Sequence, residues 1–313
     1  MRRPQAGVHQ FLRAPGPLPP LQEPEEGHGR FRIPQRVILS GGSVHIPKIG
    51  AVKVRQSQQV EGVTKSATFK RDACGHWFVS LVAETETPDI PLPAPAPERT
   101  VGVDLGLKDA VVTSDDERAP APRFYRAAQR KLRRAQRALS RRQKGSKNRA
   151  KARQRVARVH QAIAAKRNDF CHKLTTSLVR DHDAVCIEDL NVRGLARTKL
   201  ATSILDASLG TIRRQLVYKG AWNYVHVVAV DRFYPSSRLC YDCGYKHDGL
   251  TLSDRTWACP SCGVLVDRDL NAARNIKRKG LRILHVADGL SETKNVCRQD
   301  VRPPMAAALA IPA

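Results

Sequence analysis

Short stretches in the first third of the chain alternate apolar and polar residues. The stretches at 44–46, 51–54, 67–70 and 77–83 have the period of two that places successive side chains on opposite faces of a strand. Residues 72–76, which include a glycine, separate the last two stretches and are typical of a hairpin turn. The pattern predicts part of a small β-barrel over residues 35–88.

Two later predicted strands end beside acidic residues. In residues 100–105, apolar side chains alternate with glycine and Asp104, so a strand here would bury the valines and turn Asp104 to its other face. We interpret the glycines on either side of Asp104 as space for a phosphate and its metal. Residues 184–187 are apolar throughout, which is typical of a strand buried on both faces, and Glu188 follows them.

Helical spacing appears in the middle of the chain. Apolar residues recur every three or four positions within 132–139 and again within 156–178, and residues 144–147 separate the two segments. This spacing predicts a helical hairpin over residues 123–182. We expect the hairpin to pack one apolar stripe on the rest of its domain.

Three segments lack a sustained period. Residues 1–34 are rich in proline and charge, so we expect them to be disordered, and residues 89–98 predict a stiff polyproline linker. Residues 281–313 form a C-terminal tail without a predicted element. No stretch reaches the ~20 apolar residues that cross a bilayer, and no signal peptide opens the chain. We therefore expect a cytoplasmic protein.

Charge narrows the class of partner. The chain has 54 Lys and Arg against 29 Asp and Glu, a formal net charge of +25 and a pI of about 10.3. Residues 123–167 contain 18 Lys and Arg and no acidic residue, which indicates a surface that attracts phosphate backbones. A merely solvated helix pair stays open as the alternative. The expected nucleic-acid contacts are Arg130, Arg133, Arg134, Arg137, Arg141, Arg142, Lys144, Lys147 and Arg149.

Three acidic residues suit a metal site. Asp104 and Glu188 are expected at strand ends, and Asp269 precedes a helix whose apolar residues recur every three to four positions. Carboxylates brought together would repel unless cations bridged them, and Mg²⁺ prefers carboxylate oxygens, water and substrate phosphate. Two such ions about 3.5 to 4 Å apart support hydrolysis of a phosphodiester bond. The alternative, that these acids are helix caps or solvated strand ends, stays open.

Four cysteines have the spacing of a zinc ribbon. Cys240, Cys243, Cys259 and Cys262 form C-x2-C-x15-C-x2-C, a pattern in which two turns supply four thiolates to a tetrahedral Zn²⁺. Protein would fill every coordination position, so we expect this zinc to be structural. A disulfide pairing is the less favoured alternative, because the chain shows no secretory signal.

These motifs together resemble a known family. The series VGVDLGLKDAVVTSD, IEDLNVRGL, FYPSSRLCYDCG, RTWACPSCG and DRDLNAARNI is similar to TnpB, also called OrfB, an insertion-sequence protein family related to type V CRISPR effectors. The resemblance extends over about residues 33–303. It implies an α/β, RuvC-like nuclease domain of ribonuclease H fold at 99–236, a zinc ribbon inserted at 237–266, and a last RuvC segment at 267–280.

The resemblance also implies site residues and cofactors. Matched motif to motif, Asp104, Glu188 and Asp269 would hold the catalytic Mg²⁺ or Mn²⁺. Asp267 is the nearest competitor, but the family's acid directly precedes the x-Asn-Ala-Ala helix, which favours Asp269.

The resemblance further implies a function and its partners. A TnpB-like protein is expected to be an RNA-guided DNA endonuclease, with DNA and a guide RNA from the element's end as partners. Typical members carry a helical recognition segment in a longer N-terminal part, so we interpret this chain as N-terminally shortened. The alternative is therefore a weak or inactive zinc-containing nucleic-acid-binding remnant that accompanies or regulates transposition. A strand-transfer transposase would use the same acids, but the resemblance argues against it.

Overall fold

The structure, a computed structural model, divides the chain into two compact units, Met1–Thr85 with Ala306–Ala313, and Glu86–Met305. It describes residues 29–56, 59–86, 92, 94–251, 253–288 and 308–311. Most of the predicted disordered segment, part of the polyproline linker and most of the C-terminal tail lie outside the described residues. None of the helices that the structure describes is long and apolar enough to cross a membrane.

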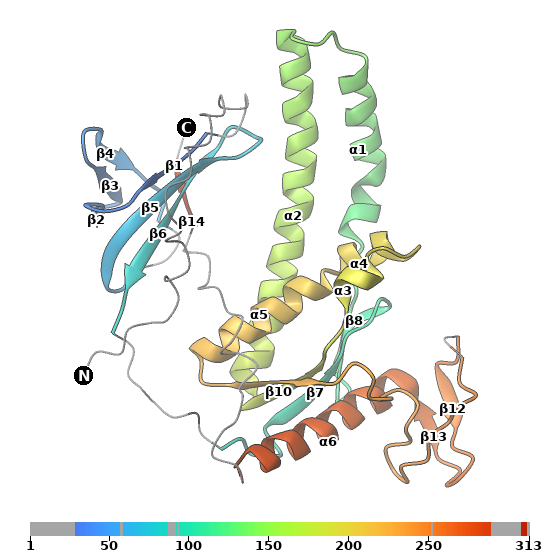
Figure 1. Cartoon of the computed structure of the whole chain (residues 1–313). Helices are drawn as coiled ribbons and strands as arrows, with labels where there is room; N and C mark the ends of the chain where they lie inside the picture. Colours follow the sequence, from blue (N-terminus) through green and yellow to red (C-terminus); the bar gives the residue numbers. More distant parts are fainter. Residues whose placement is uncertain are drawn as a thin grey trace, which may run out of the picture. The chain divides into compact units, whose positions relative to one another are not determined.

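The first unit contains two antiparallel sheets (Figure 1). One sheet has the order β1-β5-β6-β14, with bounds Arg30–Ile33, Val63–Arg71, Trp77–Glu84 and Ala308–Ile311. The other has the order β2-β3-β4, with bounds Ile38–Ser40, Ser43–Ile46 and Gly50–Lys53. Among the described residues these strands form two separate sheets, so the predicted barrel is not shown.

The four strands predicted in this unit are present as β3, β4, β5 and β6. The predicted hairpin turn is confirmed as well: the Asp72 carboxylate accepts hydrogen bonds from the backbone N–H groups of Cys74 and His76, and Gly75 has a φ of 93°. Strand β1 is a correction, because it lies inside the segment expected to be disordered. It pairs along β5, and the hydrogen bonds between the two strands hold β1 in an extended conformation. The sequence of residues 30–33 alone does not indicate this pairing.

The second unit is a mixed α/β fold around a five-stranded sheet with the order β11-β10-β7-β8-β9. Strands β7, β10 and β11 are parallel, and β8 and β9 continue the sheet in antiparallel pairs. Because the carboxyl ends of parallel strands meet at one edge, residues that end β7 and β10 come together there. The bounds are Thr100–Asp104, Asp109–Thr113, Arg118–Pro120, Ala184–Glu188 and His226–Val230 for β7 to β11.

Helices cover both faces of this sheet (Figure 1). Helices α2 (Lys147–Asp181) and α5 (Leu209–Trp222) pack on one face and α6 (Arg268–Asp288) on the other. Along β10, Val185 and Ile187 face the first layer, whereas Ala184 and Cys186 face α6, so the strand is buried on both faces as its apolar run predicts. Two short helices, α3 (Val192–Leu195) and α4 (Ala201–Ala207), connect β10 to α5.

Two glycines place α6 close to the sheet. A Cβ on Gly102 would collide with the carbonyl oxygen of Ala273, and one on Gly280 would collide with the Cys186 Sγ. A Cβ on Gly106 would lie 2.6 Å from the carbonyl oxygen of Asp109. The interpretation of Gly102 as space for a phosphate is therefore wrong, because α6 occupies that space, whereas Gly106 lines a cavity beside Asp104.

The predicted helical hairpin is formed by α1 (Phe124–Ser140) and α2 (Figure 1). Leu132 packs against Val159 and Ile163, so the apolar stripe of α1 faces α2. This corrects the expectation that the stripe packs on the rest of the domain: only the C-terminal part of α2 does so. Asp206 fixes the base of the hairpin, because its carboxylate accepts from the Tyr125 N–H at 3.0 Å and pairs with Arg167 at 2.8 Å.

Candidate metal centres

The three acids named from the sequence line one cavity of about 460 Å³. Asp104 is the last residue of β7 and Glu188 the last residue of β10, and these neighbouring parallel strands bring them to one sheet edge. Asp269 is the second residue of α6, the helix packed across the same strands. The fold thus gathers carboxyl groups that are far apart in sequence at one place.

The cavity brings negative charge together, and Arg255 offsets part of it by pairing with Asp269 at 3.5 Å. Burial, followed by the charges of Asp269 and Glu188, raises the pKa of Asp104 to about 7, although Arg268 acts in the opposite direction. Burial and then Asp189 raise the pKa of Glu188. A cluster of half-buried acids, two of which have raised pKa values, is a good environment for a divalent cation, so the residues present fit Mg²⁺ or Mn²⁺.

Asp267 is used for structure and is absent from the residues that line the cavity. Its Oδ1 accepts from the N–H groups of Asp269 and Leu270, which caps the start of α6, and its Oδ2 pairs with Arg118 at 3.2 Å. Burial alone would raise the pKa of Asp267, but these hydrogen bonds and the Arg118 charge outweigh it and lower the pKa. Asp269, two residues later, reaches the cavity instead.

Sequence reasoning assigned no role to the basic rim of this cavity. Arg232, Arg238 and Arg268 line it together with the acids. Arg232 pairs with Asp189 at 2.6 Å, and Arg268 donates to the carbonyl oxygen of Thr251 at 3.0 Å, so both side chains are held in place. The signal available in the sequence is the FYPSSRL stretch, which the family motif contains and which supplies much of the rim.

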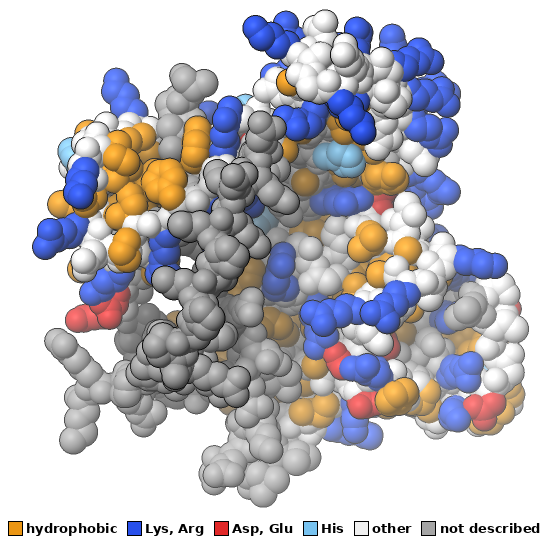
Figure 2. All heavy atoms as spheres, turned by 45° about the horizontal axis from the view of Figure 1, so that its top comes forward, with side chains coloured by type: hydrophobic (Ala, Val, Ile, Leu, Met, Phe, Trp, Pro, Cys, Tyr) orange, Lys and Arg blue, Asp and Glu red, His pale blue; other side chains and the backbone are white. Residues whose placement is uncertain are grey.

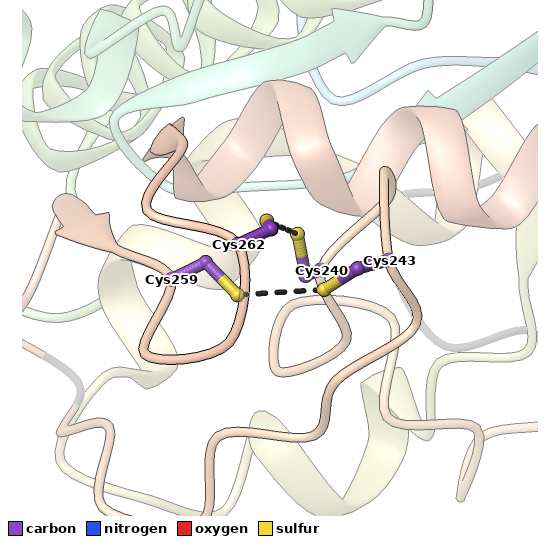
Figure 3. Close-up of side chains that lie close together, drawn as sticks. All are labelled: Cys240, Cys243, Cys259 and Cys262. Carbon is purple, nitrogen blue, oxygen red and sulfur yellow. Dashed lines mark hydrogen bonds between the residues drawn. The ribbon is translucent and has the colours of Figure 1, made fainter.

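The four-cysteine cluster predicted from spacing is present (Figure 3). The four Sγ atoms all lie within 4.8 Å of one another, with 3.7 Å between Cys240 and Cys262 and 3.5 Å between Cys243 and Cys259. Sulfurs about 2.3 Å from a tetrahedral zinc would be about 3.8 Å apart, so the cluster fits Zn²⁺. Among the described residues no other such cluster is found, so the three acids are spaced more widely than these thiols.

Both turns of the ribbon have the same geometry. Gly244 N–H donates to the Cys240 carbonyl at 2.9 Å, and Gly263 N–H donates to the Cys259 carbonyl at 2.8 Å. Both glycines have a φ near 75°, at 76° and 74°, which other residues rarely adopt. The remaining framework is the short hairpin of β12 (Thr256–Ala258) and β13 (Leu265–Asp267), with Trp257 buried beside the cysteines.

The ribbon is tied to the helix that carries Asp269. Strand β13 ends at Asp267, and α6 begins at the next residue, Arg268. The buried Asn271 accepts from the Tyr241 N–H at 2.8 Å and donates to the Leu239 carbonyl at 2.6 Å. Above the same turn, the Arg278 guanidinium lies 3.8 Å from the centre of the Tyr241 ring. Folding of the ribbon and placement of Asp269 are therefore mechanically linked.

The basic surface is carried by the hairpin of α1 and α2, where lysine and arginine side chains gather (Figure 2). Eight of the nine residues expected to contact nucleic acid are exposed, and four arginines of α1 together with Arg141, which directly follows the helix, line one surface hollow. Arg149 is the exception. It is half-buried, and its guanidinium donates to the carbonyls of Leu139 and Arg142, which closes the C-terminal end of α1. The arginines of the hollow are Arg130, Arg133, Arg134, Arg137 and Arg141.

Known proteins resemble this chain over most of its length. A model of the OrfB_IS605 family, described as probable transposases, matches residues 80–199, and one of the Cas12f1-like TNB domain matches residues 210–276. A putative RNA-guided DNA endonuclease of Streptomyces pristinaespiralis is 44% identical over 234 residues, which cover 74% of this chain and 57% of the relative. The putative RNA-guided DNA endonuclease InsQ of Escherichia coli K12 is 34% identical over 272 residues, 81% of this chain and 66% of InsQ.

The chain thus spans between 57% and 66% of the length of these two relatives. Among solved structures, a Cas12f1–sgRNA–target DNA complex aligns with 68% of this chain and 45% of its own at 16% identity and a TM-score of 0.43. The two family models match adjoining segments that together contain Asp104, Glu188, Asp269 and all four cysteines of the ribbon. The protein belongs to the OrfB family of insertion-sequence proteins, also known as TnpB.

Proposed function

We propose that this chain is an RNA-guided DNA endonuclease that hydrolyses phosphodiester bonds at the cavity of Asp104, Glu188 and Asp269. The observation that carries the proposal is the burial of the Asp104 carboxyl beside two further acids, inside a cavity with an arginine rim. A cavity lined by acids alone would repel a DNA phosphate. A cavity that bound phosphate through arginines alone would have no use for the three acids. A cation between acid and phosphate reconciles both features.

The three carboxylates would hold Mg²⁺ or Mn²⁺, which when bound polarises the phosphate and lowers the pKa of a water nucleophile. The protein's own contribution is placement. Strand ends fix Asp104 and Glu188, and the Asp267 cap together with Asn271 fixes the first turn of α6, and with it Asp269. Arg238 and Arg268 stand where they can neutralise phosphate oxygens of the substrate strand. Asp104 must lose its proton before it can serve as a ligand.

The mixed sheet supports a RuvC-like domain of ribonuclease H fold, because acids at the ends of adjacent parallel strands and on a packed helix meet at one edge. We assign this domain to residues 99–236 and 267–280, although α6 continues to Asp288. The ribbon at 237–266 would carry one structural Zn²⁺, since its four thiolates leave no coordination position for water. Residues 35–88 would form the wedge-like part of the protein.

The proposed partners are DNA and a guide RNA. The hollow lined by five arginines, four on α1 and one directly after it, offers a row of guanidinium groups that suits a phosphate backbone. The two relatives described above are named putative RNA-guided DNA endonucleases, which favours this function over a nucleic-acid-binding remnant. Guidance would leave sequence recognition to base pairing, and the protein would read shape and a short flanking motif.

The proposal is tested by comparing Asp104→Ala with Asp267→Ala. Asp104 ends β7, on which α6 packs, and Asp267 directly precedes α6. Each variant removes one of these carboxylates, but only Asp104 lines the cavity. Purified protein with its co-purified RNA should cut a matched DNA with Mg²⁺, and Asp104→Ala should abolish cutting without loss of DNA binding. Asp267→Ala should retain cutting once corrected for stability. Equal activity of wild type and Asp104→Ala would refute the site, and binding without any cutting by wild type would favour the remnant.

A further inference from the structure

One aromatic side chain at the rim of the acidic cavity is unusually exposed. Phe233 is 85% exposed, the largest value among the exposed large hydrophobic residues of the described chain, and it lines the cavity together with Asp104 and Glu188. Exposed aliphatic and aromatic residues are common on protein surfaces one at a time. A phenylalanine held out at the entrance of a charged site needs a more specific explanation.

The loop that carries Phe233 is held firmly on both sides. The Phe233 N–H donates to the Asp231 carboxylate at 2.8 Å, and the Tyr234 N–H donates to the Asp231 carbonyl at 3.0 Å, which forms a tight turn at the end of β11. The next residue, Tyr234, packs into the cluster beneath α6. Beyond it, Asn275 donates to the Ser236 carbonyl at 2.9 Å. These bonds fix the backbone from which the ring projects at the rim of the cavity.

The surroundings indicate what the ring meets. Arg232 and Arg238 lie on the same loop and line the same cavity, so a ligand that covers Phe233 and also carries negative charge fits this rim. A lipid or an apolar protein surface would not suit the acids and arginines of this rim. A nucleic-acid strand does, because each nucleotide offers one phosphate and one flat apolar base. Bases that leave the duplex stack on aromatic rings in many single-strand-binding proteins.

We propose that Phe233 stacks on a base of the DNA strand that enters the cavity, and so positions the adjacent phosphate at the acids. This inference rests on the proposed nuclease function and adds a positioning residue to it. The ring contacts the substrate beside the reacting phosphate and takes no part in bond cleavage. Because every base has a flat face, the contact would not select sequence.

Photochemical crosslinking tests the contact without any need for cleavage. Full-length Asp104→Ala protein is bound to a single-stranded oligonucleotide with 5-iododeoxyuridine at successive positions, irradiated, and mapped by mass spectrometry. We expect a crosslink at Phe233 from one or two adjacent positions. Phe233→Leu, which keeps apolar bulk without a ring face, should weaken strand binding roughly 5- to 150-fold, and Phe233→Trp should restore it.

Trp222→Leu is the matched control. Trp222 is also an exposed aromatic, at 58%, but it precedes β11 whereas Phe233 follows it, so the two lie toward opposite ends of that strand. Strand affinity should be unchanged in this control. Crosslinks at other residues only, with Phe233→Leu binding as tightly as wild type, would overturn the inference. So would a Phe233→Leu variant whose sole change is loss of a dimer by light scattering, since a second copy would then cover the ring.

Crosslinking, combined with a cleavage assay of wild type and Phe233→Leu, separates this inference from the proposed function. If wild type never cuts DNA but Phe233 crosslinks, the stacking contact stands and the nuclease proposal fails. If wild type cuts and Phe233→Leu binds and cuts equally well, the nuclease proposal stands and the stacking contact fails.

Discussion

Substitution of Asp104 by Asn should stabilise the metal-free protein. In the folded protein burial and two neighbouring acids raise the Asp104 pKa from 3.8 to about 7. A group whose pKa is raised on folding contributes stability that is complete below the unfolded pKa and is lost as pH rises through the folded pKa. Ionised Asp104 therefore opposes folding above pH 7, and asparagine, of nearly the same shape, removes that charge.

The size of the effect follows from the shift. At about 1.4 kcal/mol per pKa unit, a shift of roughly three units amounts to at most about 4 kcal/mol at pH 8 and about 2 kcal/mol at pH 5.5. Urea unfolding of zinc-loaded protein in magnesium-free, high-salt buffer should therefore show Asp104→Asn to be more stable than wild type. The advantage should grow by about 2 kcal/mol between pH 5.5 and pH 8.

Addition of magnesium should make wild type more stable than Asp104→Asn. A cation that binds the folded site but not the unfolded chain stabilises wild type, and Asp104→Asn should respond much less because it has lost a ligand. Asp267→Asn is the matched control with the opposite sign: asparagine still caps α6, but the pair with Arg118 is lost, so stability should fall by up to about 1 kcal/mol at pH 8. An Asp104→Asn variant that is no more stable than wild type at pH 8 would refute the electrostatic account of the cavity.

Three further predictions concern the parts around this site. Cys259→Ser or zinc chelation should release one zinc per chain, as measured by elemental analysis. Hydrogen exchange should then rise across residues 240–262 and the first turn of α6, while β7 and β10 stay protected. A ribbon whose exchange is unchanged without zinc would contradict the metal assignment. Arg134→Ala and Arg137→Ala should each lower DNA affinity and reduce the slope of its logarithm against that of salt by about 1, as measured by fluorescence anisotropy; an unchanged slope in both variants would remove the hollow from the interface. Arg149→Ala should instead lower the thermal stability of the hairpin and leave the salt slope nearly unchanged, because its guanidinium binds the end of α1; a full unit of slope lost there would return Arg149 to the nucleic-acid surface.

The features that the sequence predicted well are those with a local cause. A period of two predicted β3 to β7, because alternation follows directly from the geometry of a strand. The spacing of the four cysteines predicted their cluster, because two turns with glycine in the left-handed region aim both pairs of sulfurs inward. The structure also places Asp269 in the cavity and uses Asp267 as a cap, and the role of the three acids stays a prediction.

The features that the sequence did not predict depend on contacts with other parts of the chain. Gly102 stands beside Asp104 in the sequence, but its missing side chain matters to a helix that begins at Arg268. Leu132 lies on an apolar stripe whose partner is α2, and periodicity alone does not identify the surface on which a stripe packs. Arg149 belongs to a run of basic residues, and counting charges does not distinguish one basic residue from another. Its guanidinium nevertheless donates to a carbonyl oxygen of the hairpin turn. Strand β1 exists because β5 pairs with it.

Reprogrammed cleavage tests the central claim most directly. The full chain is co-expressed with its guide RNA, the guide segment is replaced by an unrelated sequence, and cutting is measured on plasmids that carry the old or the new target with Mg²⁺ present. We predict that cutting moves to the new target, disappears in Asp104→Asn, and persists in Asp267→Asn. Cutting that ignores the guide, or that persists when Asp104 has lost its charge, would contradict an RNA-guided endonuclease with its nuclease site at Asp104, Glu188 and Asp269.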